Sequence, residues 1–131
     1  MRKTGLLNTE LIAAISRIGH TQYMIISDAG LPVPEGVKVI DLALKPGLPS
    51  FRDTLEAVLS ELVIEHYYLA EEIKTKNALL DQTLTGMIDK KDCDYISHEQ
   101  LKEMSKTSEV IVRTGETSPY ANIVLVAGVN F

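Results

Sequence analysis

The sequence predicts a single α/β domain with a mainly parallel sheet and helices on both faces. Runs rich in β-branched and aromatic residues alternate with helix-like segments along the chain, an order typical of parallel sheets covered on both sides. A length of 131 residues allows one compact core and is short for two. We therefore expect one domain over residues 1–131, without internal repeats or low-complexity segments.

The first half of the chain contains two predicted helices and two predicted strands. A helix begins after Asn8, which can act as its N-cap, and is expected to end at Gly19 in the left-handed conformation. Residues 23–27 and 37–42 are β-prone, and residues 51–63 have helical periodicity. Prolines and glycines between these segments predict irregular loops. The apolar residues that define the first helix are Leu11, Ile12, Ile15 and Ile18.

The second half repeats this alternation of strand and helix. Ser97 and Gln100 form a capping-box pattern at the start of the last predicted helix. Cys93 is expected to be a small buried residue that opens a strand. The predicted elements are a strand at 66–70, one helical stretch at 73–88, a strand at 93–96, a helix at 97–105, and strands at 110–113 and 123–126.

Charge and composition exclude several classes of partner. The formal net charge is −5 and the basic residues are scattered, so no face is suited to nucleic acid or to an anionic membrane. No apolar run approaches the roughly 20 residues of a membrane span, and Cys93 is the only cysteine. We expect a soluble, cytoplasmic protein without membrane insertion, an internal disulfide or a thiolate metal site.

Two loops marked by glycine and proline, residues 19–32 and 113–122, contain clustered polar side chains. Asp28 directly follows a predicted strand, where ligands bind in open α/β sheets. Tyr120 and Asn122 alternate in what we expect to be an extended segment, which would place both side chains on one side and Ala121 on the other. An ordinary turn is the alternative interpretation of either loop.

His98 and Lys102 are four residues apart on the last predicted helix, so they share a face near its N-terminus. This arrangement fits either a ligand site or a solvated face with an incidental histidine. Phosphate-binding, dinucleotide-binding, zinc and serine-nucleophile motifs are all missing. The residue types therefore favour histidine-centred acid–base chemistry on a neutral ligand rich in hydroxyl groups.

Several of these motifs together resemble the D-ribose pyranase family, relatives of the L-fucose mutarotases, and the resemblance extends from Gly5 to Phe131. The motifs keep their order and spacing. They are Leu7-Asn8, Gly19-His20, the run from Asp28 to Pro34, Asp41-Leu42, Ser97-His98-Glu99, Arg113-Thr114-Gly115-Glu116, Pro119-Tyr120-Ala121-Asn122 and Ala127-Gly128-Val129-Asn130-Phe131.

The resemblance implies an isomerase of carbohydrate metabolism that interconverts the pyranose and furanose forms of D-ribose ahead of a kinase, without cofactor or metal. It implies that His20 is the catalytic proton donor and that Asp28 and His98 bind the sugar. The segment Tyr120, Ala121 and Asn122 would complete the pocket, and Lys102 is included because it shares a face with His98. It also implies a homodecamer of two stacked pentamers with pockets between neighbouring subunits.

Gln22 departs from the family pattern, in which an acidic residue is expected after Gly-His-Thr. If that acid orients His20, an amide there could alter the pH optimum. Three alternatives remain at this point: a mutarotase of another sugar such as L-fucose, a non-catalytic sugar-binding accessory protein, and a purely structural α/β module. Another mutarotase would act on a different sugar, and an accessory protein would bind sugar without accelerating ring exchange. A structural module would leave the polar residues dispersed in the fold.

Overall fold

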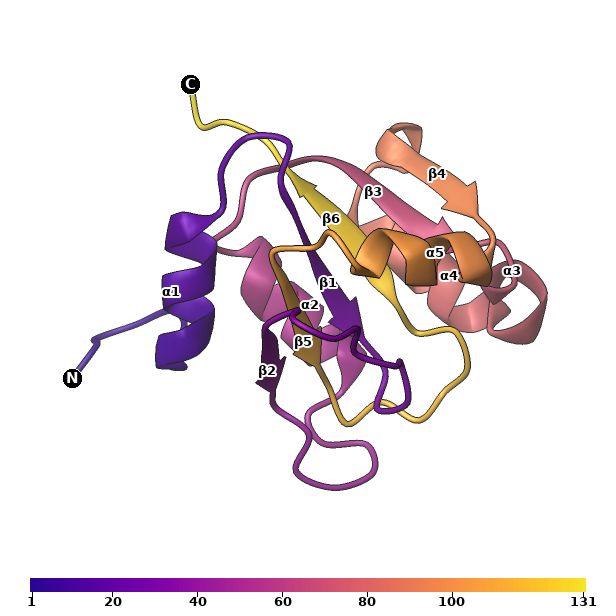
Figure 1. Cartoon of the computed structure of the whole chain (residues 1–131), viewed down its shortest axis with the longest axis horizontal. Coiled ribbons are helices and arrows are strands. Elements are labelled where there is room, and N and C mark those ends of the chain that lie inside the picture. Colours follow the sequence, from indigo (N-terminus) through magenta and orange to yellow (C-terminus); the bar gives the residue numbers. More distant parts are fainter.

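The computed structural model describes all residues, 1–131, as one α/β domain (Figure 1). None of its helices is both long and apolar enough to cross a membrane. The helices are α1 (Thr9–Arg17), α2 (Phe51–Leu59), α3 (Ile73–Lys76), α4 (Ala78–Met87), the 3₁₀ helix η1 (Lys90–Asp92) and α5 (His98–Ser105). The strands are β1 (Tyr23–Ser27), β2 (Val39–Asp41), β3 (Ile64–Ala70), β4 (Cys93–Ile96), β5 (Val110–Arg113) and β6 (Ile123–Ala127).

The six strands form one sheet in the order β2-β5-β1-β6-β3-β4. The pairs β2–β5, β5–β1 and β3–β4 are parallel. Strand β6 is antiparallel to both of its neighbours, β1 and β3. The predicted mainly parallel sheet is thus confirmed, with β6 as the one reversed strand. This reversal brings the start of β6 beside the carboxyl end of β1, which matters for the site below.

The two faces of the sheet are covered unequally. Helices α1 to α4 pack on one face around a large apolar cluster that includes Phe51, Leu55 and Tyr67. The other face carries a smaller cluster in which Leu101 of α5 and Leu31 of the loop after β1 cover Ile25 and neighbouring strand residues. Figure 1 shows α5 alone in front of the sheet and the other helices behind or beside it. Because both faces are covered, the central strands β1, β5 and β6 are buried along almost their whole length.

Two predicted helix ends differ from the observed ones. Helix α1 ends at Arg17 with Ile18 as an extended C-cap, and the positive φ of 69° falls on Thr21 rather than on Gly19. Gly19 instead donates its backbone N–H to Gln22 Oε1 at 2.7 Å. Helix α2 ends at Leu59, short of the predicted residue 63, because the chain turns there toward β3.

The predicted helical stretch 73–88 is broken at Asn77. The backbone of Asn77 leaves the helical region, with φ −151° and ψ 54°, so that α3 and α4 are separate helices. Its side-chain Nδ2 donates to Ser118 Oγ at 3.0 Å and to the carbonyl of Pro119 at 2.8 Å. A long-range contact to the loop before β6 therefore accompanies the break, and local periodicity contains no sign of it.

We expect Gly115→Ala to destabilise the fold strongly. A Cβ at residue 115 would lie 2.3 Å from the carbonyl oxygen of Leu48, in a backbone that cannot move aside easily. The free energy of unfolding should fall by about 2–3 kcal/mol, as for overpacked cores. Urea denaturation would measure it, with Gly86→Ala as the control. Gly86 has open space around its Cβ position in α4, so alanine there should be neutral or slightly stabilising. Equal stability of the two variants would contradict this prediction.

Candidate active site

A polar cavity lies at the carboxyl ends of the parallel strands, where ligands bind in open α/β sheets. It has a volume of about 310 Å³, at the small end of the range for ligand sites. Three segments form it: the loop after β1, the start of α5 after β4, and the loop between β5 and β6. The lining residues are Asp28, Gly30, Leu31, Pro32, His98, Pro119 and Tyr120.

The carboxylate of Asp28 is held at this cavity by two hydrogen bonds. Its Oδ1 accepts the backbone N–H of Gly30 at 2.9 Å, and its Oδ2 accepts Nδ2 of Asn122 at 3.0 Å. The backbone N–H of Asp28 in turn donates to Asn122 Oδ1 at 3.0 Å. An ionised carboxylate has further lone pairs beyond these two bonds. Asp28 is therefore a fixed acceptor that can still receive hydroxyl groups of a ligand.

The loop that carries Asp28 is pinned to the loop between β5 and β6. The backbone N–H of Ala29 donates to the carbonyl of Glu116 at 2.9 Å. Arg113 Nε donates to the carbonyl of Ala29 at 3.0 Å, while its Nη1 pairs with Asp41 at 3.1 Å. The Glu116 carboxylate also accepts the backbone N–H of Phe51 at 3.1 Å, at the start of α2. These bonds hold the two loops together without a ligand.

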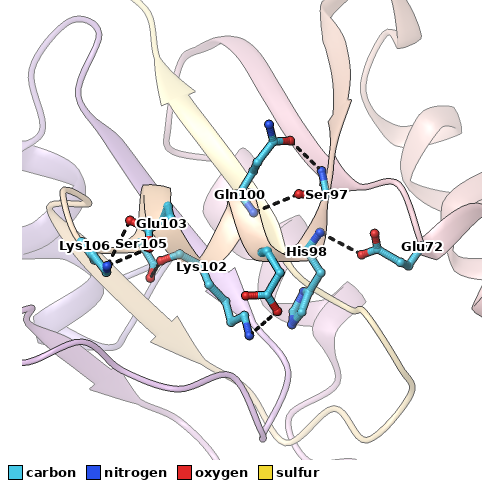
Figure 2. A network of polar contacts seen from close by, with 9 residues as sticks. Glu72, Ser97, His98, Gln100, Lys102, Glu103, Ser105 and Lys106 are labelled. Carbon is cyan, nitrogen blue, oxygen red and sulfur yellow. Dashed lines mark hydrogen bonds and ion pairs between the residues drawn. The ribbon is translucent and has the colours of Figure 1, made fainter.

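His98 is placed at the cavity by the start of helix α5. The predicted capping box is confirmed: Ser97 Oγ accepts the Gln100 N–H, and Gln100 Oε1 accepts the Ser97 N–H (Figure 2). Glu72, which follows β3, accepts the backbone N–H of His98 at 2.8 Å. The His98 ring packs edge-on against Tyr120, with centroids 5.1 Å apart. Its Nδ1 is buried without a hydrogen-bond partner, which leaves Nε2 as the nitrogen available to a ligand.

The segment Tyr120 to Asn122 is not extended, so that expectation was wrong. Tyr120 has a positive φ of 56°, and its carbonyl accepts the Asn122 N–H at 2.9 Å in a tight turn. Tyr120 lines the cavity, but Asn122 and Ala121 are fully buried. Asn122 therefore acts through its two hydrogen bonds to Asp28, and Ala121 packs in the core. The turn separates side chains that a strand would have placed together.

Lys102 lies on the same side of α5 as His98, as predicted (Figure 2). It does not line the cavity; its Nζ pairs with the Glu99 carboxylate at 2.7 Å. Hydrogen bonding to this ammonium holds the pKa of exposed Glu99 below its usual value. An exposed pair of this kind contributes little to stability. A role for Lys102 in binding would require its side chain to leave Glu99.

His20 lies at the opposite end of strand β1 from Asp28. It precedes β1, whereas Asp28 follows this five-residue strand, which spans about 13 Å at roughly 3.3 Å per residue. The Nε2 of His20 is 2.8 Å from Glu65 Oε2, in a second cavity lined by the C-terminal residues 127–131 and by Leu62 and Val63. One chain therefore brings Asp28, His98 and Tyr120 together but leaves His20 apart.

Glu72 and Asn77 were not among the predicted site residues, but they support the cavity through His98 and through the loop at residues 118–119. The adjacent acids at residues 71 and 72 are typical of a solvated helix start, so only the parallel pairing of β3 with β4 shows that Glu72 reaches His98. No group of three or more histidine, cysteine, aspartate or glutamate side chains is arranged to hold a metal ion. The cavity offers hydroxyl-binding and proton-transferring groups instead.

Comparison with known proteins gives a family and close structural neighbours. The model of the RbsD / FucU transport protein family matches residues 1–130. D-ribose pyranases from Laribacter hongkongensis and from Thermoanaerobacter sp. strain X514 are 47% and 51% identical to this chain, and the match covers 100% of both sequences in each case.

Two solved structures extend this comparison. RbsD of Bacillus subtilis, complexed with D-ribose, aligns with a TM-score of 0.96 at 44% identity, covering 100% of each chain. The fucose mutarotase of Streptococcus pneumoniae, in complex with L-fucose, aligns with a TM-score of 0.77 at 25% identity, covering 95% of this chain and 94% of its own. The predicted fold and family are both confirmed.

Proposed function

The chain belongs to the RbsD / FucU transport protein family, and on this premise we propose that it is a D-ribose pyranase, an isomerase that interconverts the pyranose and furanose forms of D-ribose. The observation that carries the proposal is the full-length likeness to the RbsD structure that contains D-ribose. The full-length similarity to proteins named D-ribose pyranase supports it. The polar cavity at Asp28 has the acceptor and donor groups that a sugar needs.

Ring interconversion requires only proton transfer. A cyclic hemiacetal opens when its anomeric hydroxyl loses a proton and its ring oxygen gains one, which breaks the bond between that oxygen and C1. The aldehyde then closes again when a different hydroxyl adds to C1 and the protons move in reverse. One acid and one base, correctly placed, are sufficient, and each typically contributes on the order of a hundred- to ten-thousandfold in rate.

The cavity residues have separate roles in this proposal. Asp28, fixed by Asn122 and by the Gly30 N–H, accepts sugar hydroxyls. His98 presents Nε2, because its Nδ1 is buried, and Tyr120 contributes its phenol beside it. Lys102 could join them only by exchanging Glu99 for the sugar. His20 protonates the ring oxygen, since an imidazole can act both as a proton donor and as a proton acceptor.

The proposed site is formed by two copies of the chain. His20 and the Asp28 cavity are separated by the length of β1, so a single subunit cannot bring both to one sugar. His20 of one subunit would complete the cavity of its neighbour. A closed ring of subunits repeats such a head-to-tail contact, and the family resemblance implies two stacked pentamers, a homodecamer. The cytoplasm is the proposed location, because the resemblance places this step ahead of a sugar kinase.

Saturation-transfer NMR tests the proposed function directly. Exchange between the pyranose and furanose anomeric signals of D-ribose is measured with and without the protein, and the measurement is repeated with L-fucose. Faster exchange of ribose ring forms is the expected result. Acceleration with L-fucose alone would instead indicate an L-fucose mutarotase. Binding of ribose without faster exchange would indicate an accessory sugar-binding protein.

Asn77→Ala is expected to weaken sugar binding more than it slows catalysis. It removes two hydrogen bonds that hold Ser118 and Pro119 beside the cavity, and each such bond is worth about 1 kcal/mol. We expect KM for D-ribose to rise roughly three- to tenfold, with kcat almost unchanged. Gln82→Ala, at an exposed position of α4, is the matched control. Unchanged KM in Asn77→Ala would show that the loop does not depend on this residue.

A further inference from the structure

His20 is held by a carboxylate that the sequence analysis did not single out. Its Nε2 lies 2.8 Å from Oε2 of Glu65, 45 residues away in the sequence. Gln22, the neighbour expected to orient this histidine, instead accepts the Gly19 N–H with its Oε1. Glu61 lines the same cavity as His20 but forms no ion pair or hydrogen bond with it. Glu65 is thus the group that contacts the imidazole.

A β-bulge explains why Glu65 points at His20. The pairing of β3 with β6 shifts between Ile64 and His66, so Glu65 is the extra residue in the register. Ile64 and Tyr67 pack in the same apolar cluster although they are an odd number of residues apart, which regular alternation would forbid. Bulges commonly redirect one side chain beside functional sites. Here the bulge lets Ile64 pack against the core while Glu65 projects toward His20 in the loop before β1.

We propose that Glu65 is a positioning residue for His20. Its carboxylate accepts the Nε2–H, which fixes the neutral tautomer with the proton on Nε2 and leaves Nδ1 to exchange a proton with the ring oxygen of the sugar. When Nδ1 is protonated, the negative charge of Glu65 stabilises the imidazolium. A second hydrogen bond that sets the tautomer and orientation of a catalytic imidazole is a general requirement of such sites. This inference rests on the proposed function of His20.

A double-mutant cycle separates this role from a merely structural one. Glu65→Gln keeps the length of the side chain and removes its charge, and the 43% exposure of the Glu65 side chain makes the variant compatible with folding. We expect kcat for ribose ring exchange to fall on the order of ten- to a hundredfold, with KM within about twofold. In the His20→Ala background, Glu65→Gln should have no further effect, because the group on which it acts is gone.

Glu61→Gln is the matched control, since it removes a nearby negative charge that has no contact with His20; its kcat should equal that of the wild type. An unchanged kcat in Glu65→Gln would overturn the inference while leaving the proposed function intact, provided that His20→Ala is impaired. An equal loss from Glu65→Gln with and without His20 would also overturn it. Full activity of His20→Ala would refute both the catalytic role of His20 and the positioning role of Glu65.

The ring nitrogens of His20 give a readout that does not depend on activity. Long-range ¹H–¹⁵N correlation spectra of the wild-type protein, recorded where the ring is neutral, should show the tautomer with the proton on Nε2. The ring shifts should change in Glu65→Gln and not in Glu61→Gln. Protonation on Nδ1 in the wild type, or identical shifts in both variants, would overturn the inference even if the protein proved to have no action on ribose.

Discussion

His20→Ala is expected to reduce kcat for ribose ring exchange on the order of a hundred- to ten-thousandfold, the usual contribution of a positioned general acid. The side chain is 51% exposed in the single chain, so its removal leaves no buried cavity and the fold should persist. Saturation transfer between the pyranose and furanose signals would measure the loss. Some exchange will remain, because the reaction also proceeds slowly in water.

The best control for this prediction is His66→Ala. His66 lies on β3 with its Nε2 3.0 Å from Asp94 Oδ2 on β4, and it is not among the residues that line the Asp28 cavity. Its replacement should leave the exchange rate within about twofold of the wild type, well below the effect of a positioned acid. If the two variants lost activity equally, the specific role of His20 would be refuted. Full activity in His20→Ala would direct attention to Asp28 and His98 as the proton-transferring pair.

The fold could be predicted in large part because local patterns determine most of its elements. The N-cap at Asn8 and the capping box at Ser97 form as their sequence patterns predict. The errors arise where a distant contact decides the local backbone. Asn77 interrupts a helical pattern while its side chain bonds to Ser118. The reversed direction of β6 likewise depends on pairing with β1 and β3, which no periodicity reveals.

The candidate site could be predicted only in part for a related reason. Asp28, His98 and Tyr120 each follow or precede a strand, so the general rule for open sheets brings them to one edge. Asn122 was expected to lie in an extended segment beside Tyr120, but a tight turn at Tyr120 buries its side chain, which bonds to Asp28. The contact of Glu65 with His20 depends on a register shift in β3. Irregular backbone of this kind has no recognisable signature in a single sequence.

Mixing two inactive variants should restore activity if each site takes residues from two subunits. His20→Ala lacks the acid, and Asp28→Ala lacks the main acceptor of the cavity; each protein alone should be almost inactive. In a random 1:1 co-assembly, half of the subunits supply an intact His20 and half supply an intact cavity. Roughly a quarter of the sites then combine both in a head-to-tail ring. Co-refolding the two variants and measuring ribose exchange would test this expectation.

The pair Asp28→Ala and His98→Ala provides the decisive control. Both residues line one cavity within a single chain, so every cavity in their mixture lacks one of them and no activity should return. If activity returns in the mixture of His20→Ala with Asp28→Ala but not in this control, His20 and the cavity come from different subunits. If neither mixture recovers activity despite confirmed co-assembly, His20 must reach the cavity of its own chain. That would require a rearrangement that closes a distance at least as long as β1. Recovery in both would show that His98 and Asp28 do not serve the same sugar.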